Sequence, residues 1–146
     1  MTRVLRTGAA VVRRLFEAVE AREVEPMYGL YASDVVIYEA PSLPWGGEFR
    51  GHHGVLRHGL GYVRTWAPLQ TAADRRLDPE FAAEGDRVVV TWRQRAHGRD
   101  GWQLDLPAVS AYALACGRIV DARMHHFDTA AILAFLAAQA RSEESA

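Results

Sequence analysis

Titratable side chains are concentrated in the segment 117–130, which reads GRIVDARMHHFDTA. If residues 118–126 form a strand, alternate side chains share a face. One face then carries Asp121, Arg123 and His125, and the other carries Ala122, Met124 and His126. A histidine enclosed in a cavity gives and takes protons near neutral pH. We therefore predict that His125 is a general acid/base; the alternative is a histidine of the core or of a dimer interface.

Three further polar residues could assist His125. Arg93, in the segment VVVTWRQRAH, could bind an enolate or carboxylate oxygen through charge-assisted hydrogen bonds. The alternative for Arg93 is a surface ion pair, which is also the favoured interpretation of Arg95. Tyr38 and Asp105 are candidates for stabilising the enolate oxygen or for positioning the histidine. The predicted catalytic set is therefore His125, Arg93, Asp105 and Tyr38.

Aromatic side chains could cover a flat ligand by stacking. Tyr38 shares a face with Val36 and Ala40, and we expect this face to line a cavity. His52 and His53 open a predicted helix, whose N-terminus attracts anions, and at most one of them should point inward. Ordinary core packing is favoured for Phe16, Trp92 and Tyr112. The predicted substrate-binding set is Trp45, His53, Trp66, Tyr62 and Phe127.

Several other chemistries find no support in the sequence. It contains no HExxH, no His-x-His pair and no carboxylate cluster at ligand spacing, so no metal site is predicted. It also lacks a glycine-rich phosphate loop, a dinucleotide fingerprint and a Gly-x-Ser-x-Gly turn, so no cofactor is expected. Cys116 lies in a turn and has no evident histidine partner.

The composition is that of one globular domain. The chain has 146 residues and a formal charge of −1, which gives no general attraction to nucleic acid or to an anionic membrane. All 17 basic residues are Arg, which suggests a bacterial source. A single Cys cannot form an internal disulfide, and Met1–Ala10 lacks the apolar core of a secretory signal. We therefore expect a cytoplasmic protein.

Hydrophobic periodicity predicts helices first and then strands. We expect helices at 11–21, from Pro26 to about Tyr31, at 54–66 and at 129–140, the last capped by Asp128. Strands are expected at 35–40, within 69–81, and at 87–97, 102–115 and 118–126. The domain should extend over 1–146, with a core at about 11–136 and a flexible tail at 141–146. This order predicts an α+β fold with helices on one face of a bent sheet.

The segment Tyr38–Val55, YEAPSLPWGGEFRGHHGV, carries a family resemblance. A strand, a Pro-x-x-Pro-aromatic-Gly-Gly turn and an Arg-Gly pair that opens a helix resemble the SnoaL-like branch of the nuclear transport factor 2-like superfamily. This superfamily includes polyketide cyclases, ketosteroid isomerase and limonene epoxide hydrolase. The resemblance covers roughly Val11 to Leu136. It implies a cone-shaped α+β barrel, in which N-terminal helices pack on a strongly curved antiparallel sheet that encloses a cavity.

The residues differ from two of these enzymes at their working positions. Phe127-Asp128 matches the epoxide hydrolase, but His125 and Arg95 stand where that enzyme has acids. The ketosteroid isomerase base corresponds to Ala40, with Glu39 on the other face, and its tyrosine corresponds to Phe16. Its remaining acid corresponds to Asp105 only if a one-residue gap is allowed. Both specific chemistries are therefore disfavoured.

The combined prediction is a small cofactor-free enzyme of polyketide-type secondary metabolism. It would catalyse acid/base cyclisation of the aldol type, or a related dehydration or isomerisation, on a polycyclic or polyketone substrate. The loop 41–51 would close the pocket mouth. The alternative is a non-catalytic binding protein for a hydrophobic intermediate, and an epoxide hydrolase-like enzyme is less favoured. An outer sheet face with Trp92, Met124 and His126 suggests a homodimer.

Overall fold

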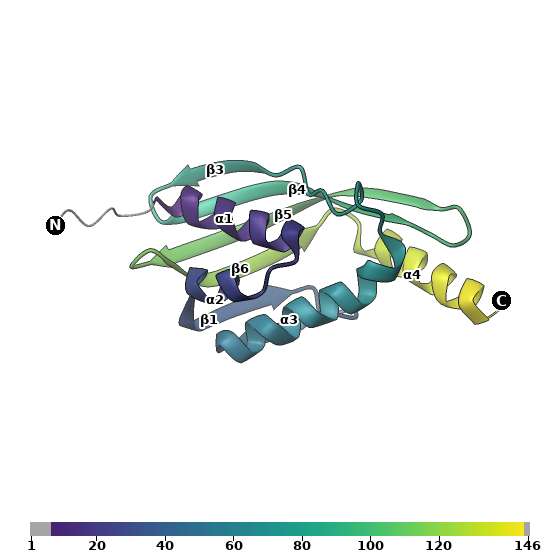
Figure 1. Ribbon diagram of the computed structural model, residues 1–146, viewed down its shortest axis with the longest axis horizontal. Helices are drawn as coiled ribbons and strands as arrows, with labels where there is room; N and C mark the ends of the chain where they lie inside the picture. Colours follow the sequence, from purple (N-terminus) through teal and green to yellow (C-terminus); the bar gives the residue numbers. More distant parts are fainter. Residues whose placement is uncertain (1–6, 145–146) are drawn as a thin grey trace.

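The computed structural model describes residues 7–144 and contains helices on one face of a curled sheet (Figure 1). This is the predicted α+β architecture. Residues 1–6 and 145–146 lie outside the described residues. The predictions for Met1–Ala10 and for the tail at 141–146 fall partly on them. The elements are α1 (Gly8–Ala21), α2 (Glu25–Leu30), β1 (Tyr31–Glu39), β2 (Gly47–Arg50), α3 (Gly51–Trp66), the 3₁₀ turn η1 (Ala67–Leu69), β3 (Glu80–Glu84), β4 (Arg87–His97), β5 (Gln103–Ala115), β6 (Arg118–His126) and α4 (Thr129–Glu144).

The sheet has six strands in the order β2-β1-β6-β5-β4-β3. All neighbours are antiparallel except β1 and β6, which are parallel. The expectation of a wholly antiparallel sheet is therefore wrong at this one pair. The first and last long strands of the chain lie side by side, and α1, α2 and α3 cover one face of the sheet (Figure 1). Residues from both halves of the chain thus meet beneath the helices.

The helix ends follow local capping chemistry. The Thr7 hydroxyl accepts a hydrogen bond from the amide of Ala10 at the start of α1. Asp128 Oδ1 accepts one from the amide of Ala131, at 2.9 Å, as expected of the N-cap of α4. This helix continues to Glu144, four residues beyond its predicted end at Ala140.

Two connecting segments differ from their predicted structure. The Pro- and Gly-rich loop contains β2, which pairs with β1. Gly47 (φ +115°), the first residue of β2, and Gly51 (φ +66°), directly after it, have conformations that glycine adopts without strain. The strand expected within 69–81 begins only at Glu80, as β3, and the residues before it include a turn in which the Thr71 amide donates to Asp74 Oδ2 at 2.8 Å. The side chain of Asp74 thus replaces a strand partner for the backbone.

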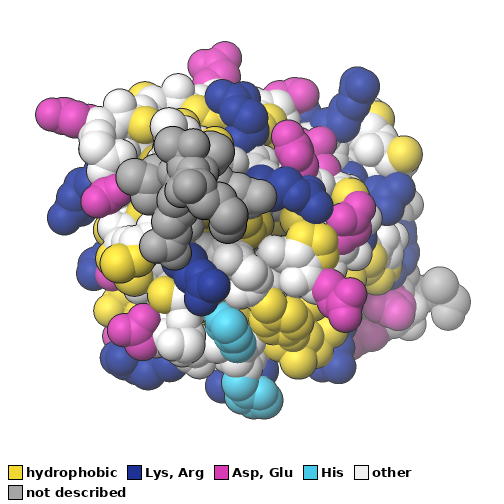
Figure 2. All heavy atoms as spheres, turned by 60° about the vertical axis from the view of Figure 1, so that its left-hand side comes forward, with side chains coloured by type: hydrophobic (Ala, Val, Ile, Leu, Met, Phe, Trp, Pro, Cys, Tyr) yellow, Lys and Arg dark blue, Asp and Glu magenta, His cyan; other side chains and the backbone are white. Residues whose placement is uncertain are grey.

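The hydrophobic side chains form two clusters. The larger lies between α1, α2 and the sheet and includes Leu15, Phe16 and Trp92. The second lies where the loop after β1, the end of α3 and α4 meet, and it contains Trp45, Trp66, Phe135 and Ile132. Seen from the end of the molecule near the N-terminus, the surface carries charges of both signs with hydrophobic side chains between them (Figure 2).

Candidate active site

A cavity of about 280 Å³ lies between the helices and the inner face of the sheet. Its walls are mostly apolar. Few polar side chains interrupt these walls, and the most buried acid among them is Glu39 at the end of β1. The lining includes Leu15, Phe16, Val19, Met27, Tyr31, Val55, Leu56, Tyr62, Val63, Leu77, Trp92, Tyr112 and Met124. A cavity of this size lies at the lower limit of ligand pockets, which measure roughly 300–1,000 Å³, so it suits a small hydrophobic ligand.

Glu39 is held between two histidines. Its Oε2 lies 3.1 Å from Nε2 of His58 on α3, and its Oε1 lies 3.0 Å from Nε2 of His126 on β6. The side chains of Glu39 and His126 are only 3% and 1% exposed, and that of His58 is 15% exposed. Glu39 and His58 line the cavity. His126 packs edge-on against the rings of Trp45 and Trp92.

These contacts determine the charge of Glu39. Burial alone would raise the pKa of this carboxyl group, but the hydrogen bonds and positive charge of His126 and His58 outweigh burial and lower its pKa from 4.5 to about 2. The group is therefore a carboxylate at neutral pH. Because a carboxylate only accepts hydrogen bonds, each histidine donates through Nε2–H. This arrangement leaves Nδ1 of a neutral His58 with its lone pair free to accept a proton.

A bulge in β6 determines which histidine faces inward. Counting by twos from the buried Ile119 reaches Asp121 and then His125. However, Val120 is an extra residue, because Ala113 pairs with Asp121 and Leu114 pairs with Ile119. The bulge shifts the alternation by one residue. Ala122, Met124 and His126 therefore point toward the interior, whereas His125 is exposed.

The predicted orientation of His125 is consequently wrong, and so is that of β1. The inward residues of β1 are Val35, Ile37 and Glu39, not Val36, Tyr38 and Ala40. Tyr38 lies on the outer face, where the Arg123 guanidinium stacks over its ring at 4.3 Å. Tyr38, Arg123 and His125 line a second hollow, of about 290 Å³, behind Glu39 and His126.

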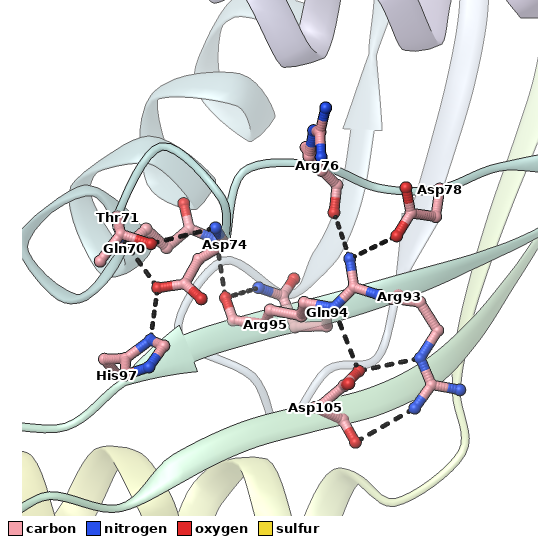
Figure 3. Close-up of polar contacts among 10 residues, drawn as sticks. All are labelled: Gln70, Thr71, Asp74, Arg76, Asp78, Arg93, Gln94, Arg95, His97 and Asp105. Carbon is pink, nitrogen blue, oxygen red and sulfur yellow. Dashed lines mark hydrogen bonds and ion pairs between the residues drawn. The ribbon is translucent and has the colours of Figure 1, made fainter.

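Arg93 and Asp105 also lie on the outer face of the sheet. Arg93 Nε donates to Asp105 Oδ1 at 2.8 Å, and Arg95 bridges Asp105 and Asp78 (Figure 3). Neither Arg93 nor Asp105 lines the cavity. They do not take the predicted place at the cavity, and the surface ion pair considered as the alternative for Arg93 is observed. The reason is that Trp92, Gln94 and Ala96 form the inner side of β4.

Of the five predicted substrate-binding residues, the structure brings only Tyr62 to the cavity. Trp45 and Trp66 are buried in the second hydrophobic cluster, with ring centroids 5.4 Å apart. His53 is exposed on α3, and Phe127 is 79% exposed after β6. These four do not line the cavity because their elements direct them to another core or to solvent.

The predicted lid and dimer face also need correction. No residue of the loop 41–51 lines the cavity. The exposed residues at its mouth are instead Glu23 and Val24 after α1, Leu60 and Val63 on α3, and Arg75. Trp92 and Met124 line the cavity and His126 is buried, so they cannot form an outer apolar surface.

His58 was not predicted as a site residue, although its spacing in the sequence is a signal for this role. His58 lies three residues after Val55 and four before Tyr62, so helical spacing places all three on one side of α3. Glu39 was assigned to the wrong face and was therefore also missed. Within residues 7–144, no group of three His, Cys, Asp or Glu side chains could hold a metal ion. No helix in the described part of the chain is long and apolar enough to cross a membrane.

Solved structures of similar fold cover most of this chain. An NTF2-like protein of unknown function from Burkholderia pseudomallei is 26% identical, with a TM-score of 0.75, over 88% of this chain and 96% of that one. TerC, crystallised with polyporic acid, is 20% identical, with a TM-score of 0.74, over 88% and 97% of the two chains. A putative SnoaL-like polyketide cyclase from Jannaschia sp. is 19% identical, with a TM-score of 0.71, over 94% and 98%.

A family match over most of the sequence identifies the family. No curated protein matches the chain. Residues 12–122 match the SnoaL-like domain, and this range extends from α1 into β6. It includes Glu39 and His58 and ends four residues before His126. The chain therefore belongs to the SnoaL-like domain family of the NTF2-like superfamily.

Proposed function

We propose that this protein is a cofactor-free acid/base enzyme acting on a small hydrophobic carbonyl compound of polyketide type. The reaction would be an aldol-type cyclisation or a related dehydration or isomerisation. One observation carries the proposal: Glu39 and His58 of the His58–Glu39–His126 cluster lie at the wall of a mostly apolar cavity. A titratable pair beside such a cavity is an arrangement that favours proton transfer.

His58 takes the role of general base in this proposal. Glu39 accepts the Nε2–H of His58 and so fixes the tautomer, with the lone pair on Nδ1. Nδ1 removes a proton from the carbon next to the substrate carbonyl, and the electron pair of the broken C–H bond forms an enolate. In a cyclisation, the enolate carbon attacks a second carbonyl carbon, and His58 returns the proton to the new alkoxide. Glu39 stabilises the imidazolium that exists between these two steps.

A binding protein without catalysis is the second candidate. Both carboxylate oxygens of Glu39 already have histidine partners, so the cluster also makes sense as a structural link between β1, α3 and β6. In that case the cavity would hold a hydrophobic intermediate and leave it unchanged. The ligand of TerC supports a small organic molecule as occupant under either candidate.

A ligand panel with two matched variants separates the candidates. Trp92 lines the cavity, so binding of β-diketones, naphthoquinones and related aromatic ketones should quench tryptophan fluorescence. Conversion is followed by absorbance and chromatography. We expect His58→Gln to lower kcat by about a hundredfold or more, as for loss of a general base, with little change in affinity. His125→Gln, on the outer face, is the control and should retain full activity.

The outcomes are distinct. Quenching without conversion of any compound favours the binding protein. A kcat of His58→Gln within about tenfold of the wild type contradicts the role of His58, since loss of a general base costs at least about a hundredfold. If no compound of the panel binds, both candidates fail.

A further inference from the structure

One charged group of the cavity has no part in the proposed reaction. Arg22 follows α1 and lines the cavity. Its Nη1 is buried and has no hydrogen-bond partner among the described residues. A buried guanidinium N–H without an acceptor costs free energy, so it requires an explanation.

The neighbours of Arg22 fix its orientation. Its Nη2 donates to Gln70 Oε1 at 2.9 Å. Gln70 in turn donates from Nε2 to the backbone oxygen of Arg95 at 2.9 Å, so its amide cannot turn over without losing this bond (Figure 3). Because the guanidinium is a planar fork, anchoring Nη2 also fixes the direction of the unpaired Nη1. Gln70 lines the cavity as well.

The backbone of Arg22 also has an unusual conformation. Its φ is +58°, in the left-handed region where glycine usually ends a helix. Its amide closes the last turn of α1 by donating to Ala18 and Val19. A glycine would meet this backbone requirement without strain, so the backbone does not explain the arginine side chain.

The charged groups around Arg22 give this part of the cavity a positive charge. Burial lowers the pKa of Arg22, and the charge of Arg75 at the mouth lowers it further. Arg22 nevertheless stays cationic, because the pKa of a guanidinium is very high. Two acids line the cavity. Glu39 is held between His58 and His126, and Glu23 is exposed, with Arg14 3.5 Å away. The structure shows no ion pair between Arg22 and either of these two acids.

We propose that Arg22 Nη1 binds a negatively charged oxygen of the ligand, so that the cavity selects hydrophobic organic acids. The oxygen belongs to a carboxylate or to the ionised hydroxyl of an enol or phenol. This inference rests on the proposed function only in taking the same cavity as the ligand site. Arg22 is then a binding residue, and Gln70 is its positioning residue.

Matched ligand pairs test this without requiring turnover. The first pair is 2-naphthoate and its methyl ester; the second is 2-hydroxy-1,4-naphthoquinone, ionised at neutral pH, and its methyl ether. Affinities are measured by titration calorimetry. We expect the wild type to bind at least one acid about tenfold or more tightly than its neutral partner. The pair that shows the preference identifies the carboxylate or the acidic hydroxyl.

Three variants assign the preference. Arg22→Met keeps the length of the side chain and should reduce the preference to about twofold or less. Arg22→Lys retains the charge but not the planar, forked guanidinium, and its preference for the acid should be at least about threefold smaller than that of the wild type. Arg75→Met removes an exposed cation at the mouth and should keep most of the preference. If circular dichroism shows that Arg22→Met does not fold, Arg22→Lys decides the question.

The inference is overturned if the wild type shows no preference for either acid, including the case in which none of the four compounds binds. It is also overturned if the preference persists in a folded Arg22 variant. His58→Gln should keep the preference, because this measurement does not involve catalysis. Acid binding, combined with no conversion of any compound in the panel used to test the proposed function, favours the binding protein over the proposed enzyme and leaves the role of Arg22 intact.

Discussion

At the scale of single residues, the central feature is the buried carboxylate of Glu39, which two histidine partners stabilise in the folded protein. Moving an isolated charge out of water costs several kcal/mol. Glu39 avoids most of this cost because each of its oxygens has a histidine partner. The cluster also connects β1, α3 and β6, so folding and proton chemistry depend on the same hydrogen bonds.

Glu39→Gln should change the acid stability of the protein. The pKa of Glu39 falls from 4.5 to about 2 on folding, so this carboxylate stabilises the fold fully above about pH 4.5. The contribution decreases as the pH falls toward 2, and it is on the order of 3 kcal/mol. We expect the variant to be less stable at pH 7 and to lose less stability between pH 4.5 and 2. Urea unfolding across this pH range measures both effects.

Glu48→Gln, an exposed carboxylate on β2, is the matched control and should follow the wild-type pH profile closely. If Glu39→Gln shows the same loss of stability in acid as the wild type, the paired carboxylate does not contribute as described.

At the scale of elements, glycines determine how closely α3 approaches its neighbours. A Cβ added to Gly54 would lie 2.6 Å from the backbone carbon of Phe49 on β2, whereas at Gly59 it would meet nothing within 4 Å. Both glycines lie in the same helix, where Ala is intrinsically preferred to Gly by about 1 kcal/mol. Close packing and helix propensity therefore oppose each other at Gly54 only.

The pair Gly54→Ala and Gly59→Ala separates these effects. We expect Gly54→Ala to destabilise the protein by about 1–3 kcal/mol, because the methyl group would push α3 away from β2. Gly59→Ala should stabilise it by about 0.5–1 kcal/mol. Chemical denaturation of the two variants checks the signs. Stabilisation by both substitutions would mean that α3 does not approach β2 as closely as the structure indicates.

The bulge in β6 is the second structural feature at this scale, and it determines which side chains face the cavity. The segment 118–126 was predicted as a strand with the bounds that the structure shows. Its two faces were also separated correctly, because strand alternation is local. The choice of the inward face failed, since the extra residue Val120 shifts the alternation and is apparent only when β5 is paired with β6.

At the scale of the whole molecule, the cavity connects ligand binding to stability. A ligand that binds only the folded state raises the free energy of unfolding by mass action, by about 2.7 kcal/mol at a concentration of 100 Kd. Gly59 lines the cavity, and its side-chain position faces open space. This position therefore allows the cavity to be filled without removing an existing contact.

Gly59→Phe should abolish ligand binding while the protein remains folded. We expect its Tm without ligand to lie within a few degrees of the wild type, because a Cβ at this half-buried helix position meets no atom within 4 Å and Phe has a higher helix propensity than Gly. The ligand that raises the Tm of the wild type should leave that of Gly59→Phe unchanged in a thermal melt. Gly59→Ala serves as the control and should retain the shift. An equal shift in Gly59→Phe would place the ligand outside this cavity.

Local patterns in the sequence were enough to predict the fold class and the family. Helical periodicity at 11–21 and alternation at 87–97 and 118–126 are local patterns, and they specify the long elements and their order, whereas β2 and the position of β3 were not predicted. Tertiary structure decided which residues meet. His125 or His126, and Tyr38 or Glu39, are equivalent by alternation. Only the parallel pairing of β1 with β6, the bulge at Val120 and the packing of α3 bring Glu39, His126 and His58 together. The physical reason is that a one-residue change of register exchanges the two faces of a strand, and register depends on partners far away in the sequence.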